Sequence, residues 1–142
     1  MRKIKMLDLD YLVLKKVFKH GELKVGSIAK NLEVPHSTVG SCIKRLEKKD
    51  LVIYERYKPV KLSSKGRELA IELTRHARLL ELLLINEFNM NPTNAHSESE
   101  KFNLLISCEL INKICQKYNH PKECPCGEEI LSSSECFCRD QI

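Results

Sequence analysis

The chain of 142 residues contains few glycines and no long apolar stretch. Its longest apolar run, residues 79–85, is interrupted by Glu81, which falls well short of the roughly 18 apolar residues of a membrane span. No apolar core segment follows the basic N-terminus, so we expect no secretory signal and a cytoplasmic location. The five glycines form no phosphate-binding loop, and the histidines have no nucleophile at a catalytic spacing. The sequence therefore predicts that the protein is not an enzyme.

Charge is distributed unevenly between the two halves of the chain. Residues 1–75 contain 18 Lys and Arg and 9 Asp and Glu, a net charge of +9, whereas residues 76–142 contain 6 and 10, a net charge of −4. A basic N-terminal half is typical of proteins that bind a polyanion such as DNA. Ordinary solvated surface charge would give the same numbers, so the charge alone does not distinguish the two interpretations.

Apolar periodicity predicts a mainly α-helical protein with one small β-hairpin. The expected helices cover residues 9–19, 27–32, 36–49, 65–89, 91–97 and 98–118, and the expected strands cover 51–57 and 60–63. Val34-Pro35 forces a turn before the third helix, and Ser63 or Ser64 is the expected cap of the fourth. This order predicts a winged helix-turn-helix at 1–74, a helical domain at 75–119 and an irregular, Cys-rich tail at 120–142.

The third helix of a winged helix-turn-helix enters the major groove of DNA with its N-terminal residues. Here those residues are small and polar, and basic side chains follow them. The expected DNA-contacting residues of this helix are His36, Ser37, Thr38, Gly40, Ser41, Lys44 and Arg45. The hairpin residues Arg56, Lys58 and Lys61 are expected to contact flanking phosphates. Capping of the helix is the alternative role for Ser37 and Thr38.

Five segments carry a family resemblance that extends to about Ile130. They are Val52-Ile-Tyr-Glu-Arg-Tyr, Leu62-Ser-Ser-Lys-Gly-Arg, Arg75-His-Ala-Arg-Leu-Leu-Glu-Leu-Leu-Leu, Ala95-His96-x-Glu98-x-Glu100 and His120-Pro-Lys-Glu-Cys-Pro-Cys-Gly-Glu-Glu-Ile. Together they resemble the iron- and manganese-dependent repressors, the diphtheria toxin repressor and manganese transport regulator family. The resemblance implies a homodimer, formed through a helical dimerisation domain, that represses by binding a palindromic operator in double-stranded DNA with two winged helices.

The resemblance also implies a metal site that bridges the first helix and the dimerisation helices. Four ligand positions of that site are retained, namely Asp8, Glu81, His96 and Glu100. Four others are lost, since they hold Tyr11, Ala77, Asn103 and Leu104. His76 lies next to Ala77 but faces about 100° away on a helix. The retained groups are either sufficient for a divalent ion or ordinary surface carboxylates and a cap. The losses argue against iron or manganese sensing.

Seven cysteines are many for a chain of this length, and in a reducing compartment they are more typical of metal sites than of disulfides. Four form two Cys-x-Cys pairs in the tail, namely Cys124 with Cys126 and Cys136 with Cys138. Two close pairs of thiolates are typical of tetrahedral zinc, with His120 as a spare ligand. Unliganded thiols or a redox pair are the alternatives. Cys42, Cys108 and Cys115 are interpreted as buried apolar thiols.

The leading hypothesis is a homodimeric, DNA-binding transcription regulator whose tail cysteines hold a structural or sensory zinc ion. A winged helix regulator that is independent of metal, or gated by thiol oxidation, is the second hypothesis. The third is a protein-interaction module that does not bind DNA. Charge reversal at Lys44 and Arg45 separates the first two hypotheses from the third. A regulator that binds DNA would lose its salt-sensitive affinity for DNA in this variant, whereas an interaction module has no such affinity to lose.

Overall fold

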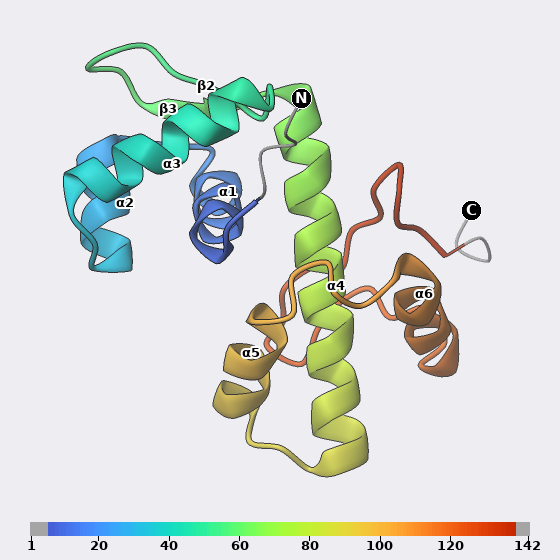
Figure 1. Ribbon diagram of the computed structural model, residues 1–142. Coiled ribbons are helices and arrows are strands. Elements are labelled where there is room, and N and C mark those ends of the chain that lie inside the picture. Colours follow the sequence, from blue (N-terminus) through green and yellow to red (C-terminus); the bar gives the residue numbers. More distant parts are fainter. Residues whose placement is uncertain (1–5, 139–142) are drawn as a thin grey trace. The chain divides into compact units, whose positions relative to one another are not determined.

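The computed structural model describes residues 6–138 of the chain (Figure 1). In chain order its elements are α1 (Asp8–His20), β1 (Glu22–Leu23), α2 (Val25–Leu32), α3 (His36–Lys48), β2 (Val52–Ile53), β3 (Val60–Leu62), α4 (Ser64–Phe88), α5 (Pro92–Glu100) and α6 (Cys108–Lys117). The chain divides into two compact units, one up to Ala70 and one from Ile71. The boundary falls within α4, so this helix contributes to both units. None of the described helices has the length and apolar character that crossing a membrane requires.

The N-terminal unit is a winged helix-turn-helix, as the sequence predicted. Apolar residues at helical spacing close a common core between α1, α2, α3 and the sheet. The buried members include Val13, Leu14, Val17, Ile28, Val39, Ile43, Leu46, Leu51 and Val60. The loop between β2 and β3 extends from the sheet as the wing (Figure 1).

The sheet has three strands rather than the two of the expected hairpin. Its order is β1-β3-β2, and β1 pairs antiparallel with β3, with Glu22 opposite Lys61 and Leu23 opposite Val60. A strand of two residues is too short to show the alternation from which strands are predicted, so β1 has no recognisable pattern in the sequence.

The turn between α2 and α3 is built from backbone geometry. Glu33 adopts a left-handed conformation with φ of 55°, and the Val34 amide donates to the Ala29 carbonyl at 3.0 Å. Pro35 is the residue that precedes the first turn of α3, and no side chain caps this helix. Ser37 therefore lies inside the helix, where its hydroxyl is available for another role.

The long helix α4 begins with a side-chain cap and a close backbone contact. The Gly66 amide donates to the Ser63 hydroxyl at 3.0 Å, which selects Ser63 from the two expected caps. A Cβ atom on Gly66 would lie 1.8 Å from the Leu51 carbonyl oxygen, so only glycine fits here. The start of α4 is thereby fixed against the chain that leads into the wing.

The expectation of one helix over residues 98–118 is wrong. Helix α5 ends at Glu100, and α6 begins only at Cys108. Asn103 adopts a positive φ of 46°, which asparagine tolerates, and the Ser107 hydroxyl accepts from the Leu110 amide at 3.2 Å as a new N-cap. The interruption brings Cys108, at the start of α6, close to α4, where its thiol lies 3.4 Å from Glu72.

The C-terminal unit is built around α4, with α5 and α6 flanking it (Figure 1). The segment after α6 contains no helix up to Cys138, the last described residue, and its side chains pack into the core of this unit. The core of the C-terminal unit is a cluster of apolar residues and thiols: Leu79, Ile111, Ile114, Cys115, Cys124, Ile130, Cys136 and Cys138. Residues 120–138 are thus part of a folded unit, although they contribute little apolar material besides the thiols and Ile130.

Candidate metal clusters and nucleic-acid interface

Three groups of potential metal ligands occur among residues 6–138, and all of them lie in the C-terminal unit. In each group the ligand atoms lie within 4.8 Å of one another. We name them the Glu81 cluster (Glu81, His96, Cys126), the His76 cluster (His76, Cys108, Cys136) and the Cys115 cluster (Cys115, His120, Cys138).

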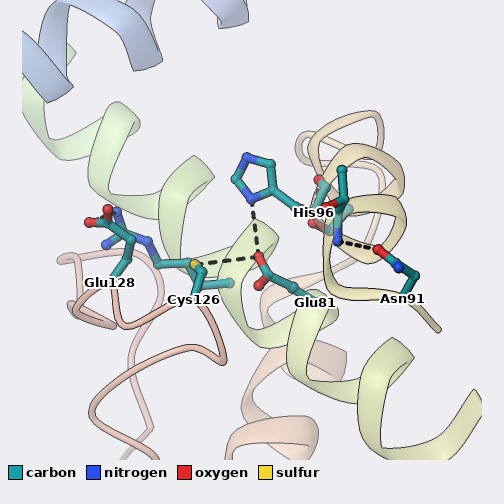
Figure 2. A network of polar contacts seen from close by, with 8 residues as sticks. Glu81, Asn91, His96, Cys126 and Glu128 are labelled. Atoms are coloured by element: carbon teal, nitrogen blue, oxygen red, sulfur yellow. Dashed lines mark hydrogen bonds and ion pairs between the residues drawn. The ribbon is translucent and has the colours of Figure 1, made fainter. Parts of the chain in front are cut away.

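In the Glu81 cluster, a buried carboxylate faces two exposed ligands. Figure 2 shows Glu81 of α4 directed toward His96 of α5 and Cys126 of the segment after α6. Glu81 Oε2 lies 3.2 Å from His96 Nδ1 and 4.0 Å from Cys126 Sγ. Glu81 is 1% exposed, and within the described structure its Oε1 atom has no hydrogen-bond partner. A buried, unsatisfied carboxylate oxygen beside an imidazole and a thiol fits a cation that enters from the solvent side.

The Cys126 thiol is protonated in the metal-free cluster. Burial, a hydrogen bond with Cys124 and the Glu81 charge raise the pKa of Cys126 to about 11. A divalent ion would displace this proton, because a coordinating thiol is held as thiolate.

The His76 cluster is more deeply buried. Glu72 and His76 lie four residues apart on one face of α4. His76 Nε2 lies 3.4 Å from Cys136 Sγ and 3.6 Å from Cys108 Sγ, and the Cys108 thiol donates to Glu72 Oε1 at 3.4 Å. Burial, with the adjacent Arg75 charge, lowers the pKa of His76 to about 4, so its imidazole is neutral. Burial also raises the pKa of Cys108 to about 12.

The Cys115 cluster lies beside a buried arginine. Cys115 Sγ is 3.6 Å from His120 Nδ1, and the Cys115 and Cys138 thiols interact electrostatically. Arg75 is fully buried, donates to Asn112 Oδ1 at 3.1 Å and lies beside the Cys115 and Cys136 thiols. Its positive charge lowers the pKa of both thiols, although their burial raises that pKa more strongly.

The structure does not bring the four tail thiols expected to bind zinc into one group. Cys126, Cys136 and Cys138 belong to three different clusters, and Cys124 belongs to none, although it lies beside Cys126. The chain after α6 passes several faces of α4 and α6, so each thiol meets a different set of helix residues. Ligand spacing in the sequence does not reveal such a distribution.

The four ligand positions that the family resemblance implies do not form one group either. Glu81 and His96 come together, whereas neither Asp8 nor Glu100 joins any of the three clusters within the described residues. Asp8 lies in the N-terminal unit, at the exposed start of α1, and Glu100 is the last residue of α5.

Sequence reasoning did not include His76, Cys108 or Cys115 among the candidate ligands. Two spacings were available as signals: Glu72 and His76 are four residues apart on a helix, and Cys108 and Cys115 are seven apart. Such spacings place side chains on one face of a helix, but they do not show what faces them.

The outer face of α3 carries the residues expected to contact DNA. Ser37, Ser41, Lys44 and Lys48 form an exposed stripe, opposite the buried stripe of Val39, Cys42, Ile43 and Leu46. His36 is also exposed and lies against Gly26 of α2, where a Cβ atom would approach its ring to 3.2 Å. Thr38 and Gly40 are half-buried.

Arg45 is half-buried and forms an ion pair within the N-terminal unit. Its guanidinium contacts both carboxylate oxygens of Asp10 at 2.8–3.2 Å, and the Asp10 side chain is fully buried. Burial acts to raise the pKa of Asp10, but hydrogen bonds from Arg45, Cys42 and the Leu7 amide outweigh it and leave that pKa below its usual value. The position of Arg45 therefore indicates a structural link between α1 and α3.

The basic residues of the wing are exposed. Arg56 lies over the Tyr57 ring at 5.0 Å, Lys58 pairs with Glu55 at 2.7 Å, and Lys61 pairs with Glu22 at 3.4 Å. Such exposed ion pairs contribute little stability, so phosphate groups could replace the carboxylates at low cost.

Comparisons with known proteins identify both units. A family model described as "Iron dependent repressor, metal binding and dimerisation domain" matches residues 63–132, and one described as "Sugar-specific transcriptional regulator TrmB" matches residues 1–65. The HTH-type transcriptional regulator MntR of Shouchella clausii is 31% identical over 108 residues, which are 74% of each chain. The iron-dependent repressor IdeR of Mycobacterium leprae is 28% identical over 103 residues, 72% of this chain and 45% of that protein. This chain thus spans less than half of IdeR.

Solved structures agree with this relationship. The manganese regulator SloR has a TM-score of 0.76 at 27% identity, covering 96% of this chain and 65% of its own. The hypothetical protein SSo2273 of Sulfolobus solfataricus has a TM-score of 0.69 at 30% identity, covering 87% and 95%. The fold and the matched domains define the class: a winged helix unit followed by a helical unit that matches the metal-binding and dimerisation domain of iron-dependent repressors. The chain belongs to the family of the MntR and iron-dependent repressors, which are transcription regulators and not enzymes.

Proposed function

We propose that this protein is a homodimeric, DNA-binding repressor whose affinity for its operator is controlled by a divalent metal ion at the Glu81 cluster. The observation that carries the metal site is the Glu81 carboxylate, which is buried, has one oxygen without a partner in the described structure, and directs the other toward His96 and Cys126. Glu81 and His96 are also positions that the family resemblance marks as ligands. The exposed stripe of α3 supports DNA binding.

The donor set favours zinc over manganese as the regulatory ion. A thiolate and an imidazole suit zinc, whereas manganese is more often held by carboxylate and carbonyl oxygens. Glu81 would supply a fixed carboxylate, His96 an imidazole and Cys126 a thiolate. The structure named "Manganese-dependent transcriptional repressor complex with manganese" has a TM-score of 0.78 to this chain at 27% identity, and ScaR with bound Zn2+ has a TM-score of 0.76 at 25% identity. Related structures thus contain either metal.

Exposed apolar side chains of the C-terminal unit support dimerisation through that unit. Leu105 is 85% exposed, Phe88 67% and Leu110 49%. Burial of such side chains against a second copy of the chain would be favourable, because it removes apolar surface from water. The matched description of residues 63–132 as a dimerisation domain supports the same assignment.

The proposal is tested by DNA binding at fixed salt concentration. The purified protein is mixed with duplex DNA that contains a randomised central segment, and bound sequences are selected and used as the operator probe. Affinity is then measured after chelation and after return of zinc, iron(II) or manganese(II). We expect chelation to weaken binding and zinc to restore it more effectively than manganese.

Two variants complete this experiment. Glu81→Gln removes the buried ligand charge, and Lys44→Glu removes a predicted phosphate contact. We expect Glu81→Gln to abolish the response to metal while retaining weak DNA binding, and Lys44→Glu to abolish DNA binding with every metal. Unchanged affinity after chelation would overturn metal control, and unchanged affinity in Lys44→Glu would overturn the proposed DNA face. Light scattering on the same samples reports whether the protein is a dimer.

A further inference from the structure

We propose that the His76 cluster is a second metal site, a buried structural zinc site whose ligands are His76, Cys108, Cys136 and Glu72. This site is distinct from the Glu81 cluster, shares no ligand with it and goes beyond the regulatory function proposed above. Its role would be to hold the segment after α6 against α4.

The distances between donor atoms match the edges of a tetrahedron around zinc. With zinc bonds of about 2.3 Å to sulfur and about 2.0 Å to nitrogen or oxygen, tetrahedral angles place neighbouring donors about 3.5 Å apart. Here the imidazole nitrogen lies 3.4 Å from Cys136 Sγ and 3.6 Å from Cys108 Sγ. Glu72 Oε1 lies 3.4 Å from Cys108 Sγ, and a rotation of this side chain toward His76 and Cys136 would bring a carboxylate oxygen to the fourth corner. The imidazole and the two thiols are thus already spaced as zinc ligands, and Glu72 completes the set through a change of its side chain alone.

The ligands come from three elements that are far apart in the sequence. Glu72 and His76 belong to α4, Cys108 is the first residue of α6, and Cys136 lies near the end of the described chain. In the described part of the segment after α6, up to Cys138, the regular backbone pairing consists of an isolated bridge between Glu123 and Glu129. Zinc commonly supplies the stability that such a segment lacks.

Arg75 provides an independent observation. This guanidinium is fully buried, and within the described part of the chain no carboxylate forms an ion pair with it. A buried charge is costly unless it has an opposite charge nearby. Zinc with two thiolates and one carboxylate has a net charge of −1, and Arg75 lies beside the Cys136 thiol, so the ligated site would neutralise it.

The site would also organise the Glu81 cluster. Cys126 and Cys136 lie on the same segment after α6, so anchoring Cys136 to α4 limits the positions that Cys126 can adopt near Glu81. The Cys115 cluster is the closest competitor as a zinc site, because it also offers two thiols and an imidazole.

The first experiment measures the ligands directly in the full chain. The Glu81→Gln/Cys126→Ser variant removes the regulatory cluster, is loaded with zinc, and is examined by X-ray absorption at the zinc edge. We expect about two sulfur neighbours at about 2.3 Å and about two nitrogen or oxygen neighbours at about 2.0 Å. A shell of three or four sulfur atoms would overturn the proposal, because the His76 cluster offers only two thiols, those of Cys108 and Cys136.

The second experiment distinguishes the His76 cluster from the Cys115 cluster. Cys136→Ser and Cys138→Ser form a matched pair, since both thiols are fully buried and lie two residues apart. Zinc content after gel filtration is measured in both and in Cys108→Ser, with circular dichroism as the check on folding. We expect zinc to be lost in Cys108→Ser and Cys136→Ser and kept in Cys138→Ser.

Any other pattern of zinc retention contradicts the assignment. Retention in both Cys108→Ser and Cys136→Ser, loss only in Cys138→Ser, or equal loss in all three would each overturn it. Retention of zinc in Glu81→Gln together with loss of metal-controlled DNA binding would separate this site from the regulatory one. If metal does not control DNA binding through the Glu81 cluster, the zinc contents expected for the Cys108→Ser, Cys136→Ser and Cys138→Ser variants remain the same.

Discussion

Arg45 of α3 binds Asp10 of α1 through both carboxylate oxygens, with the shortest contact at 2.8 Å. The Asp10 carboxylate is fully buried and also accepts the Leu7 amide at 3.0 Å, so it fixes the start of its own helix as well as the neighbouring one. Arg45 immediately follows Lys44, which is exposed on the DNA-facing stripe. Two adjacent basic residues thus have different roles, since Arg45 pairs with a buried carboxylate and Lys44 is exposed to solvent.

We expect Arg45→Ala and Lys44→Ala to affect different properties. Arg45→Ala leaves a buried carboxylate without its cation and should lower the free energy of unfolding by about 3 kcal/mol. Lys44→Ala should change the free energy of unfolding by less than about 0.5 kcal/mol. It should also reduce the slope of log affinity for DNA against log salt concentration by about 1, the value expected for one lost phosphate contact. Urea unfolding and DNA titrations at several salt concentrations measure both quantities. A stable Arg45→Ala protein would show that the ion pair is dispensable.

The stability of the N-terminal unit should fall in acid because of Asp10. The pKa of Asp10 is lower in the folded protein than its usual value, so the ionised carboxylate favours the folded state. This contribution is present above about pH 4, near the unfolded pKa, and is lost as the pH falls through the folded pKa. Asp10→Asn should unfold at lower temperature near neutral pH, and the difference from the unmodified protein should shrink below about pH 4. Melting temperatures of both proteins, measured from neutral pH to below about pH 4, test this direction. A difference in melting temperature that grows as the pH falls would contradict the assignment to Asp10.

Two helical glycines should respond in opposite directions to alanine. At Gly66 the added Cβ atom would lie 1.8 Å from the Leu51 carbonyl oxygen, so we expect a loss of about 2 to 3 kcal/mol from overpacking. At Gly40 no atom lies within 4 Å of the added Cβ, so alanine should stabilise α3 by up to about 1 kcal/mol. Unfolding of the two variants without DNA measures the contrast. Equal effects at the two positions would show that the contact with Leu51 does not constrain α4.

The identity of the ligand at position 126 should set the metal preference. Cys126→Asp replaces the thiolate of the Glu81 cluster with a carboxylate, which makes all donors oxygen or nitrogen. We expect the metal concentration needed for half-maximal DNA binding to rise for zinc and to fall for manganese. Cys138→Ser serves as the control, because Cys138 belongs to the Cys115 cluster and not to the Glu81 cluster. An unaltered ratio between the two metals would remove Cys126 from the regulatory site.

The sequence by itself determined the order of the elements and most of their buried faces. Helical spacing in α1 and α3 marks Val13, Val17, Val39 and Ile43 as core residues, and Val34-Pro35 marks the turn before α3. These features depend on neighbours within one or two helical turns, so they can be read along the chain. The exposed polar residues at the start of α3 follow from the same periodicity.

The roles of the polar and sulfur-containing residues depend on tertiary structure. Arg45 resembles Lys44 in sequence, and only Asp10, 35 residues away, distinguishes it. Cys136 and Cys138 form an apparent ligand pair, yet one meets His76, 60 residues away, and the other meets Cys115. A ligand set and a buried ion pair are defined by groups that converge in space from distant parts of the chain. Local periodicity contains no information about that convergence, so only the packing of α4, α6 and the segment after α6 decided it.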